Sequence, residues 1–283
     1  MTPAQPAGDS AGLPGSQPPE SVAFDRIAGS YDETRGLRPE VSELVADRIE
    51  AAAGPAARLL EIGVGTGRVA LPLHGRGREI TGVDLSLPML ERYRAKAAAA
   101  GLPPPPVLRA DAGRLPFRDA CVDAVLEAHV LHLVPDWERV LDEVQRVLVA
   151  GGMLLHAGGG AYQRGSGSPR DQVIRRFDEL AFAGGGTPRM VGAASRRQVL
   201  DALAARGGRV EELEPVTWEE PETYAEALGW VEDRVFSAHW RLPDERWRSA
   251  ATQVRGEFEA AHPDDLDLPH PTRHTFTFTA IRF

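Results

Sequence analysis

The stretch LLEIGVGTGRVALPL, residues 59–73, places three glycines directly behind an apolar run that ends in the pair Glu61-Ile62. The apolar run predicts a short buried strand, and the glycines predict a loop whose backbone lies close to a ligand. A dinucleotide-binding loop has the spacing Gly-x-Gly-x-x-Gly, but Arg68 stands where its third glycine would fall. Glu61 would repel phosphate oxygens, whereas it could accept hydrogen bonds from an ammonium group or stabilise nearby positive charge. The loop therefore favours a cationic nucleoside ligand. The three glycines are Gly63, Gly65 and Gly67.

The composition limits the classes of function that the chain can have. Its 283 residues, 42% of them hydrophobic, suffice for one large α/β domain, and the net charge of -9 without a basic cluster disfavours a nucleic-acid partner. There is no run of about 18 apolar residues, so no membrane partner is expected. Residues 1–20 are rich in proline, glycine, serine and alanine and predict a disordered tail. The single cysteine, Cys121, excludes an internal disulfide and a Cys-rich zinc site, and we expect a cytoplasmic protein without a metal.

Strand and helix patterns alternate after residue 40. Apolar residues at helical spacing, short apolar runs and Gly-Gly or Pro-rich breaks follow one another along the chain. Strands separated by helices imply parallel pairing through right-handed crossovers, and hence a doubly wound α/β sheet. Strands are expected within residues 57–63, 78–85, 107–111, 121–128 and 153–157, and helices within 39–52, 86–100 and 136–148, with a further helix from about residue 68.

Acidic residues stand at the ends of three consecutive predicted strands. Ligands of such sheets bind at the carboxyl ends of the strands, where Glu61 lies. Asp84 closes the second strand about 20 residues after the first glycine, where an acidic side chain accepts both ribose hydroxyls. Asp111 closes the third and could accept from an exocyclic adenine amine. The set matches a ligand with an amino-acid end, a ribose and an adenine. The alternatives without a ligand are a tight strand-helix turn at the glycines and a turn capped by Asp111.

These blocks resemble the class I S-adenosylmethionine-dependent methyltransferases that act on small molecules. Residues 59–73 look like the first motif of that family, and ITGVDLSLPML, residues 80–90, is similar to its second block. Residues 110–148 resemble the third and fourth blocks, and AGGMLLHA, residues 150–157, resembles the Gly-Gly turn and fifth strand. The resemblance is continuous from about residue 25 to 157 and thins beyond it.

The resemblance implies S-adenosylmethionine as cofactor and a seven-stranded, mostly parallel Rossmann-like sheet. The implied strand order is 3-2-1-4-5-7-6, with HTFTFTAIRF, residues 274–283, as the antiparallel last strand behind a helical insert. Residues 21–283 would form the methyltransferase domain, with helical elements at 158–206 and 220–272 on the substrate side. The residues expected to bind the cofactor are Glu61, Gly63, Gly65, Thr66, Gly67, Asp84, Leu85, Asp111, Ala112, Glu127 and Tyr31.

The N-terminal segment 23–40 resembles the part of this family that lies over the bound cofactor. Tyr31 would cover the methionine moiety, where its aromatic face can favour the sulfonium cation. Arg35 or Arg38 could pair with the carboxylate of the cofactor. The alternative is an amphipathic helix that only packs on the sheet.

Two histidines follow the fourth predicted strand, at the side of the cleft where the methyl group should point. His129 and His132 are three residues apart and would share one face if the loop is helical. A histidine with a pKa of about 6.5 can accept a hydroxyl proton. His132, with His129 as second choice, is therefore the candidate catalytic base. The alternative is that His132 is only a packed structural residue. Alignment of the acceptor with the methyl group would then be enough to accelerate methyl transfer.

The sequence thus predicts methyl transfer to a small-molecule acceptor, at oxygen or carbon rather than nitrogen. The alternatives are a nicotinamide-dependent oxidoreductase, disfavoured by Glu61 and Arg68, and a protein that binds S-adenosylmethionine without catalysis. The aromatic-rich insert at 220–262 either packs on the sheet or lines a substrate pocket, and it is a candidate surface for a homodimer. Its large aromatic residues include Trp230, Phe236, Trp240 and Trp247.

Overall fold

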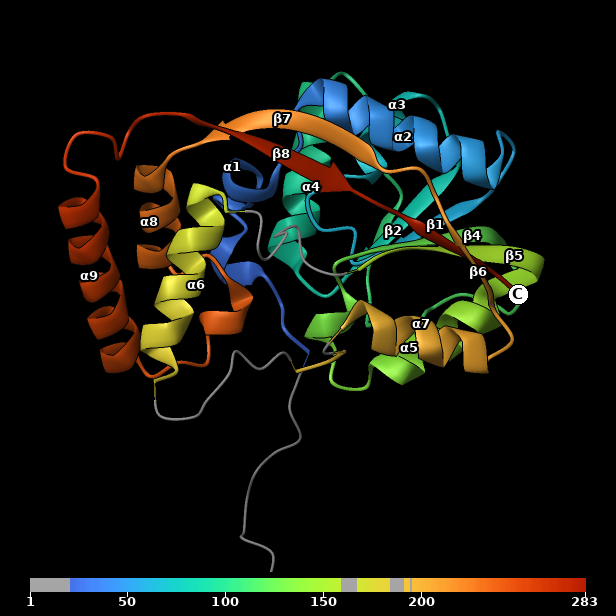
Figure 1. Ribbon diagram of the computed structural model, residues 1–283. Coiled ribbons are helices and arrows are strands. Elements are labelled where there is room, and N and C mark those ends of the chain that lie inside the picture. The colour runs from blue at the N-terminus through green and yellow to red at the C-terminus, as the bar shows by residue number, and fades with distance from the viewer. Residues whose placement is uncertain (1–20, 159–166, 184–190, 194) are drawn as a thin grey trace, which may run out of the picture.

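The computed structural model describes residues 21–158, 167–183, 191–193 and 195–283. The tail predicted at 1–20 lies outside these residues. Figure 1 shows a central sheet covered by helices on both faces, with a separate group of helices at one end. No helix in the described ranges is both long and apolar enough to cross a bilayer.

Seven strands form one sheet in the order β3-β2-β1-β4-β5-β9-β6. The first five are parallel, and β9 pairs antiparallel with both β5 and β6. Numbered within this sheet, the order is the predicted 3-2-1-4-5-7-6, and the fold class is confirmed. The strands are β1 (Leu59–Ile62), β2 (Ile80–Asp84), β3 (Val107–Arg109), β4 (Val122–Ala128), β5 (Leu148–Ala157), β6 (Arg209–Glu212) and β9 (Thr279–Arg282).

Apolar residues bury both faces of this sheet. Neighbouring residues of a strand point to opposite faces, so Leu59 packs with α2, α3 and α4, while Leu60 packs with α5 and α7. Such two-sided burial is typical of parallel sheets, whose crossover helices cover both faces. The helices of these two layers are α2 (Pro39–Ala53), α3 (Ala70–Gly75), α4 (Leu87–Ala99), α5 (Trp137–Val147) and α7 (Arg196–Ala205).

Local sequence signals fix where the helices begin. Ser86 caps α4 as predicted, because its hydroxyl accepts the Met89 amide at 3.3 Å. The helix predicted from about Arg68 begins later, at Ala70, because the glycine loop continues as a series of turns. The ligand loop is therefore longer than the sequence pattern indicates.

A third group of helices packs around its own apolar cluster, and we call α6, α8 and α9 the helical cap. Figure 1 places the cap beside the sheet, joined to it by the long ribbon of β7 (Val216–Glu222) and β8 (His270–Phe276). Two short helices, η1 and α1, lie in the N-terminal segment, and two more single turns follow β4 and α8. The bounds are α6 (Pro169–Ala181), α8 (Tyr224–Glu232), α9 (Asp244–Ala261), η1 (Asp25–Ile27), α1 (Tyr31–Arg35), η2 (Leu131–Leu133) and η3 (Ser237–His239).

The ribbon of β7 (Val216–Glu222) and β8 (His270–Phe276) is a two-stranded antiparallel sheet that the sequence did not predict. The stretch 274–283, expected as one strand, is therefore divided between β8 and β9. Likewise the segment 220–272, expected to be helical, begins and ends in strands and is helical only between them. The alternating pattern of these strands fits either sheet, so only pairing across the chain decides their partners.

Candidate active site

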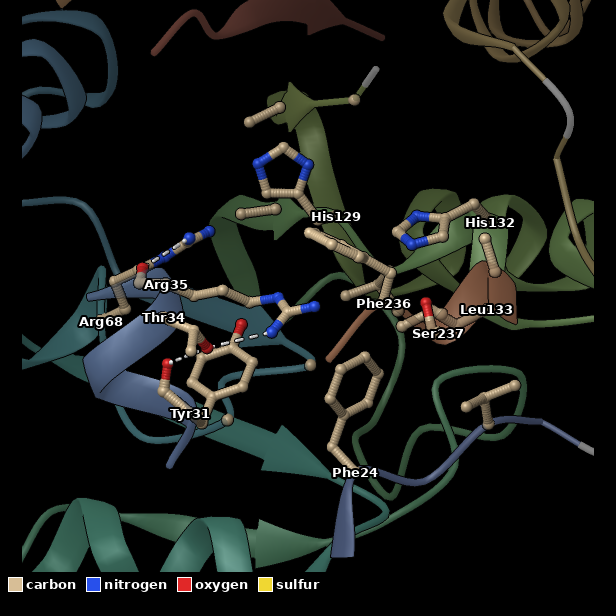
Figure 2. A pocket seen from close by; sticks show the side chains of 18 of the residues that line it. Phe24, Tyr31, Thr34, Arg35, Arg68, His129, His132, Leu133, Phe236 and Ser237 are labelled. Carbon is tan, nitrogen blue, oxygen red and sulfur yellow. Dashed lines mark hydrogen bonds between the residues drawn. The ribbon is translucent and has the colours of Figure 1, made fainter. Parts of the chain in front are cut away.

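A cavity of about 890 Å³ lies between the carboxyl ends of the parallel strands and the helical cap. Loops that follow β1, β2, β3, β4 and β5 form one side of it, and residues of α1, α6, η3 and β8 form the rest. Figure 2 shows side chains from these separate segments converging on the space. The volume lies near the upper end of the range of about 300–1,000 Å³ for small-molecule pockets, which leaves room for two ligands side by side.

The glycine loop after β1 forms the floor of this cavity. Gly63, Gly65 and Gly67 all have positive φ, at 65°, 55° and 77°, where other residues are strained. A Cβ on Gly63 would collide with the Val130 side chain, and one on Gly67 would collide with the Tyr93 ring. Gly63 and Gly65 line the cavity, whereas Gly67 is required by internal packing.

Glu61 is buried at the end of β1, and its Oε2 has no hydrogen-bond partner within the described residues. Burial raises the pKa of this carboxyl to about 8, although the Arg68 guanidinium opposes the rise. An unpartnered buried carboxylate beside a loop whose backbone approaches a ligand is suited to an ammonium group. The α-amino group of S-adenosylmethionine meets that requirement, so the residues fit this cofactor.

Arg68 occupies the position where a dinucleotide loop has its third glycine. Its Nη1 donates to the Arg35 carbonyl at 3.1 Å, and its guanidinium lies 5.6 Å from the centre of the Phe276 ring. The side chain lines the cavity and occupies the place where a helix would pack close to the strand in a dinucleotide fold. This arrangement supports the predicted preference against a nicotinamide cofactor.

Asp84 lines the cavity at the end of β2 and also holds its walls together. Its two carboxylate oxygens accept the backbone amides of Gly65 and Ser86, each at 2.8 Å. Burial raises the pKa of Asp84, and these two hydrogen bonds counteract the rise. The side chain can therefore accept ribose hydroxyls only with the lone pairs that remain.

Replacing Asp84 with alanine should weaken S-adenosylhomocysteine binding by about 2–4 kcal/mol, because charge-assisted hydrogen bonds are lost. It should also lower the melting temperature, because two backbone amides lose their acceptor. Asp84→Asn keeps the shape of the side chain and one acceptor oxygen. Its affinity and melting temperature should therefore lie between those of the wild type and the alanine variant. Calorimetry and thermal unfolding of the same preparations measure both effects. Wild-type affinity in the alanine variant would remove Asp84 from the ribose site.

The other predicted cofactor residues divide into two groups. Leu85, Asp111, Ala112 and Tyr31 line the cavity. Asp111 also accepts the Gly113 amide at 2.8 Å, so it caps its own turn as well. The remaining four do not line the cavity, and their part in cofactor binding stays a prediction. These four are Glu61, Thr66, Gly67 and Glu127.

Thr66 and Glu127 instead position other parts of the site. The Thr66 hydroxyl donates to Asp32 at 2.6 Å and so ties the glycine loop to α1. Glu127 is buried at the end of β4, where one oxygen accepts the amides of Val130 and Leu131 at 2.5 and 3.2 Å. Both side chains therefore hold loops that line the cavity.

The second oxygen of Glu127 is bonded to Nδ1 of His156, which lies on β5 and is 2% exposed. Burial alone would raise the pKa of Glu127, but His156 and the loop amides hold it below its ordinary value. His156 was not singled out from the sequence. The signal that could have found it is a histidine in the otherwise apolar strand MLLHA, because a buried polar side chain needs a partner.

His129 and His132 both line the cavity, as predicted, and Figure 2 shows their rings facing it. His129 has a φ of 63° and packs edge-on against Phe276, and burial together with Arg68 lowers its pKa to about 3. Burial also lowers the pKa of His132, with Arg35 acting in the same direction and Glu127 against it. Both rings are therefore neutral at neutral pH, and His132 is the stronger base of the two.

Comparison with known proteins agrees with this geometry. Residues 60–156 match a family described as Methyltransferase domain. The chain is 38% identical over 122 residues to phosphatidylethanolamine N-methyltransferase of Cereibacter sphaeroides, covering 43% of this chain and 60% of that protein. It is 44% identical over 100 residues to demethylmenaquinone methyltransferase of Thermus thermophilus, covering 35% and 45%. It spans about half the length of the curated relatives that it matches.

Solved structures share the fold. The YcgJ protein of Bacillus subtilis superposes with a TM-score of 0.55 at 19% identity, covering 84% of this chain and 97% of that one. A Haemonchus contortus phospholethanolamine N-methyltransferase 2, solved with S-adenosylhomocysteine, has a TM-score of 0.50 at 17% identity, covering 92% and 57%. The family match thus assigns a methyltransferase domain to residues 60–156, and the solved structures show that the chain shares their fold.

Proposed function

We propose that the chain transfers the methyl group of S-adenosylmethionine to a small-molecule acceptor, at oxygen or carbon. The observation that carries the proposal is the buried Glu61 oxygen, which has no partner in the described residues and lies beside the glycine loop. When bound, the cofactor supplies an electrophilic methyl group on a positively charged sulfur. The strand-end carboxylates Asp84 and Asp111 line the same cavity and would hold its ribose and adenine.

The walls of the cavity support a small acceptor. Residues of α1, η3 and α6 line it opposite the strand ends, so an acceptor would lie between the sheet and the helical cap. The cap and α1 would exclude water and hold the acceptor in line with the methyl group.

The neutral His132 ring would accept a proton from a hydroxyl or a carbon acid. An amine acceptor that is cationic at neutral pH would instead face the guanidinium group of Arg35, which lines the same cavity. Oxygen or carbon is therefore favoured over nitrogen as the acceptor atom.

Cofactor affinity should rise with pH between about pH 6 and 8. Glu61, whose folded pKa of about 8 lies above its ordinary value of 4.5, is protonated in this window, and an ammonium ligand requires its ionised form. Binding must therefore expel a proton, and affinity should increase by up to about tenfold per pH unit. The Glu61→Gln variant should lose this dependence. Calorimetric titrations with S-adenosylhomocysteine across the window measure it, and a flat wild-type profile would speak against the ammonium contact.

The same pKa has a consequence for the protein without ligand. Since the folded carboxyl keeps its proton up to about pH 8 while the unfolded one loses it near 4.5, Glu61 should make the protein less stable as pH rises between these values. The Glu61→Gln variant should show a smaller fall in melting temperature over that range. This control separates the burial of Glu61 from its contact with the cofactor.

Incubation with cofactor labelled in its methyl group and with pools of small metabolites tests the proposed activity. Label should appear in a small-molecule product, and Gly65→Val should abolish both transfer and cofactor binding, because φ at this position is positive and the loop lies against the cavity. Strong S-adenosylhomocysteine binding with no labelled product in any pool would contradict the transferase and favour a protein that only binds the cofactor.

A further inference from the structure

The charged side chains that line the cavity are unevenly paired. Within the described residues, each carboxylate of the lining accepts at least one hydrogen bond, from a backbone amide or from another side chain. Arg35 and Arg68 are partly buried, have no carboxylate within ion-pair distance in the same ranges and donate to neutral oxygens, whereas Arg175, which also lines the cavity, is exposed. The paired carboxylates are Asp84, Asp111, Asp171, Asp178, Glu179, Glu212 and Glu220.

One of these two guanidinium groups is accounted for by the cofactor itself. The ammonium and carboxylate of an amino acid are bonded to the same carbon, so they lie within a few ångströms of each other. If the ammonium meets Glu61, the carboxylate must lie close by. Arg68 directly follows the glycine loop and lines the cavity, and its charge acts on Glu61, so we assign it to the cofactor carboxylate. The sequence suggested Arg35 or Arg38 for this role; Arg38 instead bonds the Glu219 carbonyl and does not line the cavity, whereas Arg35 does line it.

Arg35 remains, and its surroundings differ from those of Arg68. Its two terminal nitrogens donate to neutral oxygens, the Val235 carbonyl at 2.9 Å and the Thr34 hydroxyl at 3.2 Å, so its charge is not neutralised. Figure 2 shows its side chain reaching into the middle of the cavity. Arg35 lines the same cavity as His132, the candidate base, and its charge adds to burial in lowering the pKa of that histidine.

Aromatic rings surround this guanidinium group. The Arg35 carbon Cζ lies 5.5 Å from the centre of the Tyr31 ring, and 6.0 Å from those of Phe24 and Phe236. Phe24 comes from the N-terminal segment and Phe236 from the segment between α8 and η3, so both sides of the cavity contribute. Flat apolar walls around a fixed cation suit a ligand with an aromatic or apolar body and a negative charge.

We propose that the acceptor is an organic oxyanion, a carboxylate or a phosphate monoester on an aromatic or apolar body, whose charged group binds Arg35. The proposal rests on the methyl transfer proposed above, because it takes Arg68 to be used by the cofactor. A guanidinium group presents a planar fork of donors that can bond two oxygens of either anion at once. Arg35 would thus select the acceptor and place it beside His132.

Matched naphthalene derivatives test the preference for charge. A naphthalene carboxylate is compared with its carboxamide, and naphthyl phosphate with naphthol, by ligand-observed NMR with saturating S-adenosylhomocysteine. At least one anion should bind about tenfold or more tightly than its neutral counterpart, as a charge-assisted bond of about 1.4 kcal/mol would give. The two arms decide between carboxylate and phosphate. Equal binding within both pairs, or binding by none of the four probes, would overturn the proposal.

Variants assign the preference to one side chain. Arg35→Met keeps the apolar stem of the side chain and removes its charged group, so it should reduce the preference for the anion to less than about twofold while S-adenosylhomocysteine still binds. Arg68→Met should do the opposite and weaken S-adenosylhomocysteine. Arg38→Met, at an exposed arginine outside the cavity, is the matched control and should change neither. An unchanged preference in Arg35→Met contradicts the proposal.

The probes are also measured without S-adenosylhomocysteine, so that the two proposals can fail separately. If the protein does not bind S-adenosylhomocysteine but prefers the anions through Arg35, the proposed function fails and the anion site stands. If it binds S-adenosylhomocysteine and shows no preference for charge, the proposed function stands and the anion site fails.

Discussion

Replacement of His132 by alanine should lower the single-turnover rate of a hydroxyl acceptor by about 10² to 10⁴ and leave S-adenosylhomocysteine affinity within about threefold of wild type. The ring lines the cavity at η2, just after β4. Burial lowers the pKa of both histidines there, and that of His132 is lowered less than that of His129. The loss should shrink for an acceptor that is already ionised, because no proton then has to be removed. Single-turnover rates with the acceptor found by methyl labelling measure the effect.

The pH profile adds a second test of the same residue. Because burial and Arg35 hold the pKa of His132 below its ordinary value, the wild-type rate should persist at pH values where an ordinary histidine is already protonated. His74→Ala, on α3 and outside the cavity, is the control and should leave the rate unchanged. A stable His132→Ala variant with wild-type turnover would exclude His132 as base and leave His129 or alignment alone.

Replacement of Glu127 by alanine should destabilise the protein by about 3–5 kcal/mol, the cost of breaking a buried pair. The change leaves the His156 ring and the amides of Val130 and Leu131 without their shared acceptor. On the usual scale for chains of this size, the melting temperature should fall by roughly 10 °C. The Glu127 carboxylate also fixes the turn at His129, whose φ is positive. The folded fraction of the variant should therefore transfer methyl groups more slowly than the wild type.

Two further variants make this prediction specific. Glu127→Gln keeps an oxygen for the loop amides and should recover part of the stability. Glu138→Ala, an exposed glutamate on α5, should change the free energy of unfolding by less than about 0.5 kcal/mol. Differential scanning calorimetry measures all three, and a Glu127→Ala variant that unfolds at the wild-type temperature would show that the Glu127 pair is not structural.

The central sheet was predictable because its signals are local. The glycine loop, the Ser86 cap and the alternation of apolar runs with helical spacing are each contained in a few neighbouring residues. The resemblance to a family then supplied the strand order, which no local pattern contains. The ribbon of β7 and β8 was missed because the residues that pair, such as Trp218 and His274, are far apart in the sequence.

The same distinction applies to the site. Residues that follow strand ends, such as Asp84 and His132, were predictable because the fold brings strand ends together. The hydrogen bond from the Gly65 amide to Asp84, which holds the glycine loop, could not be predicted. It depends on how β1 and β2 pair. The environment of Arg35 could not be predicted either, because Phe24 and Phe236 come from opposite ends of the chain.

Titration of the purified protein with S-adenosylhomocysteine and, separately, with NADH tests most directly that this cavity is built for an adenosine that carries an amino-acid end and not for a dinucleotide. The glycine loop offers a buried carboxylate and Arg68 where a dinucleotide fold offers a helix end and a third glycine. We expect S-adenosylhomocysteine to bind at least about 100-fold more tightly than NADH, a difference of about 2.7 kcal/mol. Equal or tighter binding of NADH would contradict the assignment of the cofactor, and with it the proposed methyl transfer.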